Sequence, residues 1–527
     1  MYIHKINHLN AVMLLISIQV LFPLILSAQS GKAVNPIIFA DVPDASIIRV
    51  EDTYYMSSTT MHMSPGVPVM KSMDLVNWEI IGYAYNSLVD NAAMNLSNGQ
   101  NAYGRGSWAS CLRYYEGRYY LSTFAQTSGK THVFTTDDIE SGQWEEVSFA
   151  PSYHDHTLHF EDDGRIYMIW GAGEIRIVEL KPDFSGIIPE TEQVLISNAS
   201  QPAGDNIMLQ AEGSQLFKIN GFYYLFNIVW PLDGMRTVLV HRSESLHGPY
   251  EGRVALADRG IAQGGLIDTP AGDWFAYLFR DFGAVGRIPY LVPVTWEDNW
   301  PVLGEDGKVP ESLPLPASAG LIPNLVSSDE FERKETDGYS LPLVWQWNHN
   351  PIEESWSLTE RKGYLRLRSE RLDQSFLDTR NTLTQRTFGP QSQVVTKLDV
   401  SGLKQGDVAG LALLQKEFGY IGVKNNGQQK SIVMVLGKDQ NEEVQAEIPL
   451  ESGEVFLKAS CDFENRKDQA LFYYSLDGVD WEKFGQTLEM KYTLPHFMGY
   501  RYGLFFYAEK ELGGYADFDF FRIDRGL

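Results

Sequence analysis

The sequence predicts an all-β protein with two domains, a five-bladed β-propeller followed by a β-sandwich. Three observations support this prediction. Five similar strand-turn-strand units recur in the first part of the chain, a proline-rich segment follows them, and the later strands do not repeat the earlier unit. A β-sandwich is the alternative for any chain of short strands, but it does not predict five similar units with polar first residues.

The repeated unit is clearest in the segment DNIMLQAEGSQLFKINGFYYLFN, from Asp205 to Asn227. Polar and apolar residues alternate before Asn220-Gly221, a dipeptide typical of tight hairpin turns, and the aromatic residues after it favour a return strand. We therefore expect a β-hairpin with Glu212 at its head, where the head is the residue that opens the unit.

Four other segments repeat this pattern. The first residue of a Tyr-Tyr-like pair in the return strand follows the first head by 10 residues and each of the other heads by 11, and the five heads are Asp44, Trp108, Asp155, Glu212 and Gln263. Because side chains in a strand alternate between faces with a period of two, equal offsets place the heads at equivalent points of five similar hairpins.

Turns and polar outer strands follow several of these hairpins and complete candidate blades, at Met70 to Tyr85, Thr135 to Phe149 and His241 to Arg253. In a propeller the first strand of each blade lines the central channel, so the heads should converge at one end of it. We assign residues 33–305 to the propeller.

The chain changes character after the fifth unit. Residues 306–325 contain four prolines and no sustained apolar period, which indicates a linker or a strap along the surface. Residues 326–527 alternate as in antiparallel strands and end in YADFDFFRID. This pattern predicts a second, β-sandwich domain.

The N-terminal residues 1–28 have the form of a secretory signal peptide. Lys5 precedes an apolar run, and small residues near Ala28 offer a cleavage site. A retained membrane anchor is the alternative, although the run is short and contains Pro23. We expect a secreted or periplasmic protein whose mature chain has no membrane span.

The net charge of the chain argues against nucleic acid as a partner, and its two cysteines raise the question of a disulfide bond. Removal of residues 1–28 takes away Lys5 and no acid, so the formal charge changes from −25 to −26. Such an acidic chain is not expected to bind nucleic acid. Cys111 and Cys461 lie in different predicted domains. A secreted protein could pair them, but two buried thiols are the simpler expectation.

Three of the five heads are acids, namely Asp44, Asp155 and Glu212. Gathering them at one end of a channel is unfavourable through repulsion and desolvation, and such crowding raises at least one pKa. A protonated acid beside an ionised base is what the hydrolysis of glycosidic bonds requires. Each acid alone could cap a turn or be a solvated charge, but their shared position favours a joint chemical role.

Two histidines, His154 and His156, flank Asp155 and suggest a metal site. Alternation along a strand would send neighbouring side chains to opposite faces, so satisfied or exposed histidines are the simpler expectation. We predict no metal ligands there.

Five ordered segments between Asn35 and Gly304 allow a comparison with known families: NPIIFADVPDASIIRVEDTYYMSST, GSWASCLRYYEGRYY, HDHTLHFEDDGRIYMIWG, LQAEGSQLFKINGFYYLF and GGLIDTPAGDWFAYLFRDFGAVGRIPYLVPVTW. Together they resemble glycoside hydrolase family 43. The resemblance implies that Asp44 is the general base, Glu212 the general acid, and Asp155 the carboxylate that orients the acid and tunes its pKa.

The same resemblance implies roles in substrate binding. Arg287 matches a substrate-gripping arginine and Trp108 an aromatic wall of the sugar pocket, and we group the fifth head, Gln263, with them. Residues 326–527 resemble the concanavalin-like β-sandwich of many β-xylosidases and arabinofuranosidases in this family. In such relatives a phenylalanine of this domain closes the pocket, and HFMGYRYGLFF suggests Phe497 for that role. An ordinary core aromatic is the alternative.

Several positions depart from the family's pattern. Ala45 and Ser110 stand where proline is usual, which alters only turn stiffness. Ala262 stands where many relatives have a histidine that helps to hold a central calcium or hydrated ion, so calcium is not expected to be required. Residues 61–63, Met-His-Met, replace an aromatic part of the sugar-binding wall, which could change substrate preference.

The sequence therefore predicts an inverting exo-glycosidase that removes terminal β-D-xylose or α-L-arabinofuranose from an oligosaccharide or polysaccharide, without a required cofactor. The resemblance supplies the pentose and does not separate the two sugars. A lectin-like propeller that binds glycans without cleaving them and an endo-acting arabinanase of the same fold are the alternatives. The complete trio Asp44, Asp155 and Glu212 argues against the lectin, since binding alone needs no acid of raised pKa.

Overall fold

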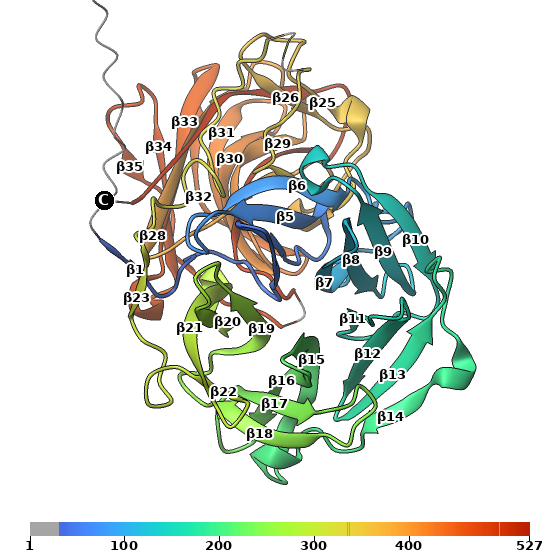
Figure 1. Ribbon diagram of the computed structural model, residues 1–527. Helices are drawn as coiled ribbons and strands as arrows, with labels where there is room; N and C mark the ends of the chain where they lie inside the picture. The colour runs from blue at the N-terminus through green and yellow to red at the C-terminus, as the bar shows by residue number, and fades with distance from the viewer. Residues whose placement is uncertain (1–30, 335, 337, 495, 527) are drawn as a thin grey trace, which may run out of the picture.

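The computed structural model describes residues 31–334, 336, 338–494 and 496–526, and these residues form the predicted propeller and sandwich (Figure 1). The fold class is confirmed. Five antiparallel four-stranded sheets surround a channel, and the inner strand of each contacts the inner strands of its neighbours. The ring closes where β19 contacts β2, so the first and last blades lie side by side.

The twenty blade strands follow the chain from the channel outward. Blade I contains β2 (Ser46–Val50), β3 (Thr53–Ser57), β5 (Gly66–Ser72) and β6 (Glu79–Tyr85). Blade II contains β7 (Ser107–Tyr115), β8 (Arg118–Ala125), β9 (Lys130–Thr136) and β10 (Glu145–Phe149). Blade III contains β11 (Thr157–Phe160), β12 (Ile166–Ala172), β13 (Glu174–Leu180) and β14 (Gln193–Ile196).

The last two blades repeat this order. Blade IV contains β15 (Ile207–Ile219), β16 (Phe222–Pro231), β17 (Thr237–Ser243) and β18 (Glu251–Leu256). Blade V contains β19 (Ala262–Asp268), β20 (Trp274–Asp281), β21 (Arg287–Glu297) and β22 (Trp300–Leu303). The predicted hairpin in blade IV is confirmed: Asn220 and Gly221 form the turn with φ of 50° and 83°, and Ile219 pairs with Phe222. Positive φ at both central residues is what such a tight turn requires.

The five heads all lie at the channel end of the inner strands, but not at one strand position. Asp44 and Asp155 precede β2 and β11 by two residues. Trp108, Glu212 and Gln263 lie inside β7, β15 and β19, each at a place where the strand register shifts. Such bulges re-aim a side chain and are frequent beside active sites.

The C-terminal domain is a sandwich of two antiparallel sheets. One sheet runs in the order β32 (Asn441–Leu450), β31 (Lys430–Lys438), β30 (Glu417–Asn425), β29 (Asp407–Leu414), β37 (Arg501–Ala508), β27 (Leu383–Arg386), β24 (Gln346–Asn348) and β4 (Met63–Ser64). The other runs in the order β25 (Trp356–Ser357), β26 (Leu365–Arg368), β38 (Tyr515–Asp524), β28 (Gln391–Asp399), β33 (Glu454–Asp462), β34 (Gln469–Ser475) and β35 (Glu482–Lys483), with β36 (Leu488–Glu489) also on β34.

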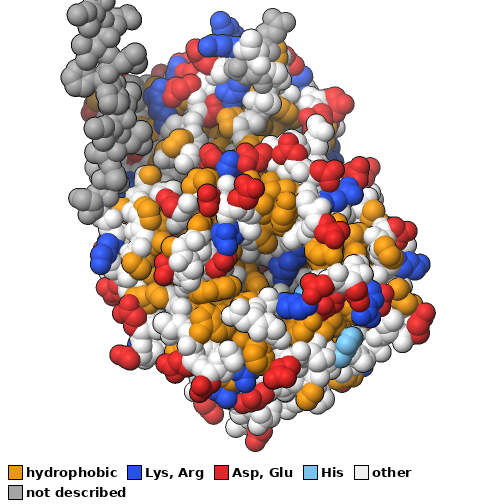
Figure 2. Space-filling model, viewed as in Figure 1, with side chains coloured by type: hydrophobic (Ala, Val, Ile, Leu, Met, Phe, Trp, Pro, Cys, Tyr) orange, Lys and Arg blue, Asp and Glu red, His pale blue; other side chains and the backbone are white. Residues whose placement is uncertain are grey.

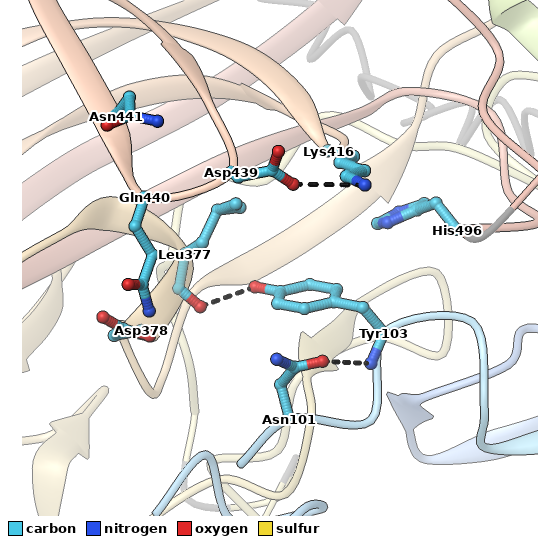
Figure 3. A pocket seen from close by; sticks show the side chains of 9 residues that line it. All are labelled: Asn101, Tyr103, Leu377, Asp378, Lys416, Asp439, Gln440, Asn441 and His496. Atoms are coloured by element: carbon cyan, nitrogen blue, oxygen red, sulfur yellow. Dashed lines mark hydrogen bonds and ion pairs between the residues drawn. The ribbon is translucent and has the colours of Figure 1, made fainter. Parts of the chain in front are cut away.

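The two domains share structure. The edge strand β4 of the sandwich comes from the loop between β3 and β5 of blade I, and it pairs with β24. In the strap after blade V, β23 (Ser312–Pro316) returns to pair with β1 (Lys32–Val34). The domains also meet around the cavity of Figure 3, where the Tyr103 hydroxyl of the propeller donates to the Leu377 carbonyl of the sandwich at 2.8 Å. The sandwich is therefore built onto the propeller rather than tethered to it.

One outer strand differs from the prediction of a polar outer face. The strand β6 is largely buried, whereas β10 and β18 are mostly exposed as predicted. The reason is that the sandwich covers blade I, and the Tyr83 hydroxyl of β6 donates to the Leu343 carbonyl at 2.6 Å.

Other predictions concern the surface and the chain ends. Cys111 and Cys461 are both buried and unpaired, as expected. On the face shown in Figure 2, acidic and basic side chains are interspersed rather than gathered in one basic patch. No helix within the described residues is long and apolar enough to cross a membrane. The predicted signal peptide, residues 1–28, lies outside the described residues.

Candidate active site

A single cavity of about 270 Å³ brings the predicted site residues together. It lies at the channel end where the heads converge, and loop residues of the sandwich complete it. All seven residues predicted for catalysis or substrate binding line this cavity: Asp44, Trp108, Asp155, Glu212, Gln263, Arg287 and Phe497.

Backbone conformation helps to aim three of the five heads. Asp44, Asp155 and Gln263 adopt φ of 52°, 45° and 57°, in the left-handed region that side chains other than glycine rarely occupy. Such residues persist only where the surroundings hold them, and they cluster at functional sites. These three heads therefore share one backbone conformation at this end of the channel.

Asp44 is held by a guanidinium group. Arg287 Nη1 donates to both carboxylate oxygens of Asp44, at 3.0 and 2.9 Å, and both side chains are buried. Burial raises the pKa of Asp44, and the charge of Arg287 opposes that rise. Because arginine does not release its proton in proteins, the geometry is that of a carboxylate-guanidinium ion pair.

Arg287 also ties the two domains together at the site. Its Nη2 donates to the carbonyl oxygen of Phe497 in the sandwich, at 3.1 Å. The substrate-gripping role that the resemblance implies remains a prediction. The observed contacts show that this arginine orients the Asp44 carboxylate and the loop that carries Phe497.

Asp41 is a positioning residue that the sequence did not reveal. Its carboxylate accepts the backbone N–H of Arg287 at 2.7 Å and the backbone N–H of Gly499 at 3.1 Å. Gly286 leaves room for it, since a Cβ there would lie 2.2 Å from Asp41 Oδ1. Asp41 thus fixes both the start of β21 and the loop next to Phe497. The sequence could not indicate this role, because the two N–H groups that Asp41 binds belong to segments far away in the chain.

The other two acids have a different partner. His154 Nε2 lies 3.0 Å from Glu212 Oε2 and 3.7 Å from Asp155 Oδ2. The side chains of Asp155 and Glu212 are 7% and 19% exposed, and that of His154 is 41% exposed. Burial raises the pKa of Asp155 to about 7, with Glu212 and Asp44 adding to the rise and His154 opposing it. The expectation that crowding raises at least one pKa agrees with this direction.

The histidines beside Asp155 do not alternate between faces as expected. Residues 153–156 precede β11 and are not a strand, so His154 and Asp155 both line the cavity. His156 is a satisfied core histidine, since its ring nitrogens lie 2.9 Å from the Tyr153 carbonyl and 2.8 Å from the Ser122 hydroxyl. The functional interest therefore lies in His154, which the sequence interpretation set aside.

Aromatic and apolar side chains form the wall of the cavity. The rings of Trp108 and Phe497 lie 4.9 Å apart, so the two domains meet at this wall. Met61 lines the cavity, whereas Met63 belongs to β4 and His62 is fully buried beside Tyr103. Only one residue of the Met-His-Met segment therefore faces a substrate.

Several lining residues were not predicted from the sequence. Arg236 Nη2 pairs with Asp281 Oδ2 at 2.8 Å at the edge of the cavity, and the Arg236 guanidinium lies 5.2 Å from the Trp230 ring. Tyr492 and Leu494 of the sandwich complete the rim. None of these residues is a head of the repeated unit, so the equal spacing of the heads could not identify them.

The described residues do not fit a histidine-held calcium in the channel. A small cavity behind the heads is lined by Asp44, Asp155, His156 and Gln263. The side chain of Ala262 has no ligand atom, and both nitrogens of His156 are engaged in hydrogen bonds. Among the described residues, His154, Asp155 and Glu212 alone form a group of three histidine, cysteine or acidic side chains whose donor atoms lie within 4.8 Å of one another. Those atoms face the substrate cavity and pair with each other.

Comparisons with known proteins agree with this architecture. The model of glycosyl hydrolases family 43 matches residues 33–301. The model of the beta xylosidase C-terminal concanavalin A-like domain matches residues 328–524.

Individual relatives are similar over most of the chain. A beta-xylosidase of Formosa agariphila is 30% identical, over 94% of this chain and 90% of its own length. A non-reducing end alpha-L-arabinofuranosidase of Bacteroides ovatus is 27% identical, over 81% of this chain and 82% of its own length.

A solved structure described as a bifunctional GH43-CE protein of Bacteroides eggerthii is 61% identical with a TM-score of 0.93. The match covers 94% of this chain and 64% of that one. The propeller with its convergent acids, the sandwich that completes the cavity and the family match over half of the sequence lead to one conclusion: this chain is a glycoside hydrolase of family 43.

Proposed function

We propose that the protein is an inverting exo-glycosidase that removes a terminal pentose, β-D-xylose or α-L-arabinofuranose, from plant-type hemicellulose or pectin oligosaccharides. The single observation that carries the proposal is the pair of electrostatic environments in one cavity. Asp44 lies against a guanidinium that cannot titrate, whereas Glu212 and Asp155 share a histidine that can.

The proposed mechanism assigns one role to each acid. Asp44 accepts a proton from the attacking water, and Glu212 donates a proton to the departing glycosidic oxygen. Asp155 orients Glu212 and adds negative charge beside it. Inversion requires carboxyl groups about 6.5 to 9.5 Å apart, so that a water fits between the base and the sugar.

The size of the cavity supports exo action. A volume of about 270 Å³ is small for a ligand site, since such sites usually span about 300 to 1,000 Å³. Tyr492, Leu494 and Phe497 of the sandwich contribute to its lining. A terminal sugar suits this cavity better than a polysaccharide chain that passes through it, which disfavours the endo-arabinanase alternative.

The pentose is proposed from the relatives. The names of the Formosa agariphila and Bacteroides ovatus proteins specify a beta-xylosidase and an alpha-L-arabinofuranosidase. The two sugars present similar hydroxyl patterns to one pocket, so we propose either or both as substrates. The lectin alternative needs no acid with a raised pKa, and Asp155 has one.

A panel of nitrophenyl glycosides tests the proposal. The wild-type protein should hydrolyse the β-D-xylopyranoside or the α-L-arabinofuranoside, and Asp44→Asn should serve as the inactive control. Oligosaccharide digests should release one pentose at a time from the non-reducing end. NMR of the first-formed sugar should detect the inverted anomer; a retained anomer would show that Asp44 is not a base. Binding of glycans without turnover would favour the lectin.

We further propose that the protein is exported through cleavage near Ala28 and that catalysis requires no cofactor. The form of residues 1–28 supports export. The lack of a fitting calcium ligand at Ala262 supports the second proposal. N-terminal sequencing of the protein recovered from its native host would test the cleavage site.

A further inference from the structure

His154 occupies a constrained position at the mouth of the site. Its ring lies 5.3 Å from the ring of Phe124, nearly perpendicular to it, and 6.2 Å from the ring of Trp108. These contacts aim Nε2 at the Glu212 carboxylate, 3.0 Å away. The ring is therefore fixed by packing, while part of it remains open to water.

This contact is more than an ordinary surface ion pair. Such pairs contribute about 0 to 1 kcal/mol because both partners are solvated, but here the carboxylate partners are mostly buried. Within the part of the chain that the structure describes, His154 is the only basic side chain within 4.0 Å of Glu212 or Asp155. These acids thus depend on one titratable group for their neutralisation.

We propose that His154 is a positioning residue for Glu212, which fixes the carboxyl group by a charge-assisted hydrogen bond from the imidazolium. The inference rests on the proposed function and deepens it. After Glu212 has given its proton to the leaving oxygen, the imidazolium holds the resulting carboxylate in place until Glu212 takes up a new proton from solvent. Asp44 releases to solvent the proton that it took from water, so the protons balance over one turnover.

The surrounding charges support an imidazolium. Burial lowers the pKa of His154, but Asp155, the hydrogen bond and charge of Glu212, and Asp44 outweigh it and raise the pKa to about 9. Asp44 is itself paired with Arg287, and the packing rings of Trp108 and Phe124 carry no charge. At neutral pH the ring therefore holds both protons, and Nε2–H donates to the Glu212 carboxylate.

The kinetic test compares three variants. His154→Gln keeps an amide donor without a titratable proton, and His154→Phe removes both. The matched control is His132→Gln on β9, because His132 also contacts a glutamate, Glu146 at 2.7 Å, but does not line the cavity. We expect His154→Gln to lower kcat about 10- to 100-fold for alkyl pentosides, part of the 10²- to 10⁴-fold effect of a general acid. For dinitrophenyl pentosides kcat should fall less than about 3-fold, since their leaving groups need little protonation.

On alkyl pentosides, kcat should fall further in His154→Phe than in His154→Gln. His154→Phe should also alter the basic limb of the pH profile of kcat. The control should change neither. A merely structural role would slow both kinds of substrate equally and lower the Tm, and that result would overturn the proposal. Unchanged rates and pH profiles in His154→Gln would overturn it as well.

A readout without substrate separates this inference from the proposed function. In ¹⁵N NMR of the wild-type protein, the His154 ring, identified by its loss in His154→Gln, should remain an imidazolium up to about pH 9. In Glu212→Gln its midpoint should move toward the ordinary value of 6.5. An unmoved midpoint would show that Glu212 does not stabilise the imidazolium and would overturn the proposal, whatever the enzyme hydrolyses.

Discussion

The two sides of the cavity hold their acids in different ways. On one side, Arg287 binds Asp44 through two hydrogen bonds, and both side chains are buried. On the other side, His154 contacts Glu212 and Asp155, and the ring remains 41% exposed. An arginine cannot give up its proton, whereas a histidine can, so the first side favours a fixed charge and the second favours proton transfer.

The two sides also differ in where their partners come from. Arg287 and Asp44 come from the last and first blades, which are neighbours only because the propeller closes. Asp155 and His154 are adjacent in sequence, and Glu212 lies on the next blade. Closure of the ring therefore assembles the ion pair of the proposed base, whereas two neighbouring blades supply the environment of the proposed acid.

The largest expected effect comes from removal of the base. Asp44→Asn keeps the shape and can still accept a hydrogen bond from Arg287, but its amide cannot take a proton from water. We expect kcat to fall about 10³-fold or more for every pentoside, whatever its leaving group. Steady-state kinetics with paired alkyl and dinitrophenyl substrates measures this. A loss confined to poor leaving groups would assign Asp44 to the acid instead.

Removal of the acid should produce a selective loss. Glu212→Gln should slow alkyl pentosides about 10²- to 10³-fold and dinitrophenyl pentosides less than about 10-fold, because good leaving groups depart without a proton. The ratio of the two rates is the measurement. Equal losses would mean that Glu212 does not act as a general acid.

Replacement of Asp155 should have a smaller effect on rate, about 10²-fold, and a distinctive effect on stability. The folded-state pKa of Asp155, about 7, lies above its ordinary value of 3.8. The contribution of Asp155 to the free energy of unfolding is therefore fully present below pH 3.8 and is lost as the pH rises through 7.

Asp155→Asn lacks this dependence, so its free energy of unfolding relative to the wild type should rise between pH 4 and pH 7. Denaturant titrations at several pH values would measure the difference. A difference that falls over the same interval would contradict the raised pKa.

The contribution of the sandwich should be more modest. Phe497→Ala removes one wall of the cavity while leaving the backbone carbonyl that accepts from Arg287. We expect kcat/KM to fall about 10-fold, mainly through KM, which corresponds to about 1.4 kcal/mol. Val479→Ala, at an exposed site in the same domain, serves as a control. An unchanged KM would leave Phe497 as an ordinary core aromatic.

The smallest effect should come from metal removal. Incubation with EDTA should leave activity nearly unchanged, because Ala262 offers no ligand atom and the acids are paired with Arg287 and His154. Loss of most activity, restored by calcium, would reveal a ligand set that the proposal lacks.

Repetition made much of the fold predictable. Hairpins such as that around Asn220-Gly221 arise from neighbouring residues, so turn chemistry and alternation suffice to identify them. The five heads were found because equal offsets in similar hairpins give equivalent positions. The bulges that place Glu212 and Gln263 inside their strands were not visible, since a bulge depends on the pairing of two strands.

The sequence by itself determined which acids meet, because the repeat places Asp44, Asp155 and Glu212 at one end of a channel. It did not determine the electrostatic environment of each acid. That was decided by partners distant in the chain: Arg287 is 243 positions from Asp44 and 210 positions from Phe497. The turn before β11, with Asp155 at positive φ, likewise brought His154 to Glu212. Electrostatic environment depends on the distances between side chains in space, and only the closed and capped propeller fixes those distances.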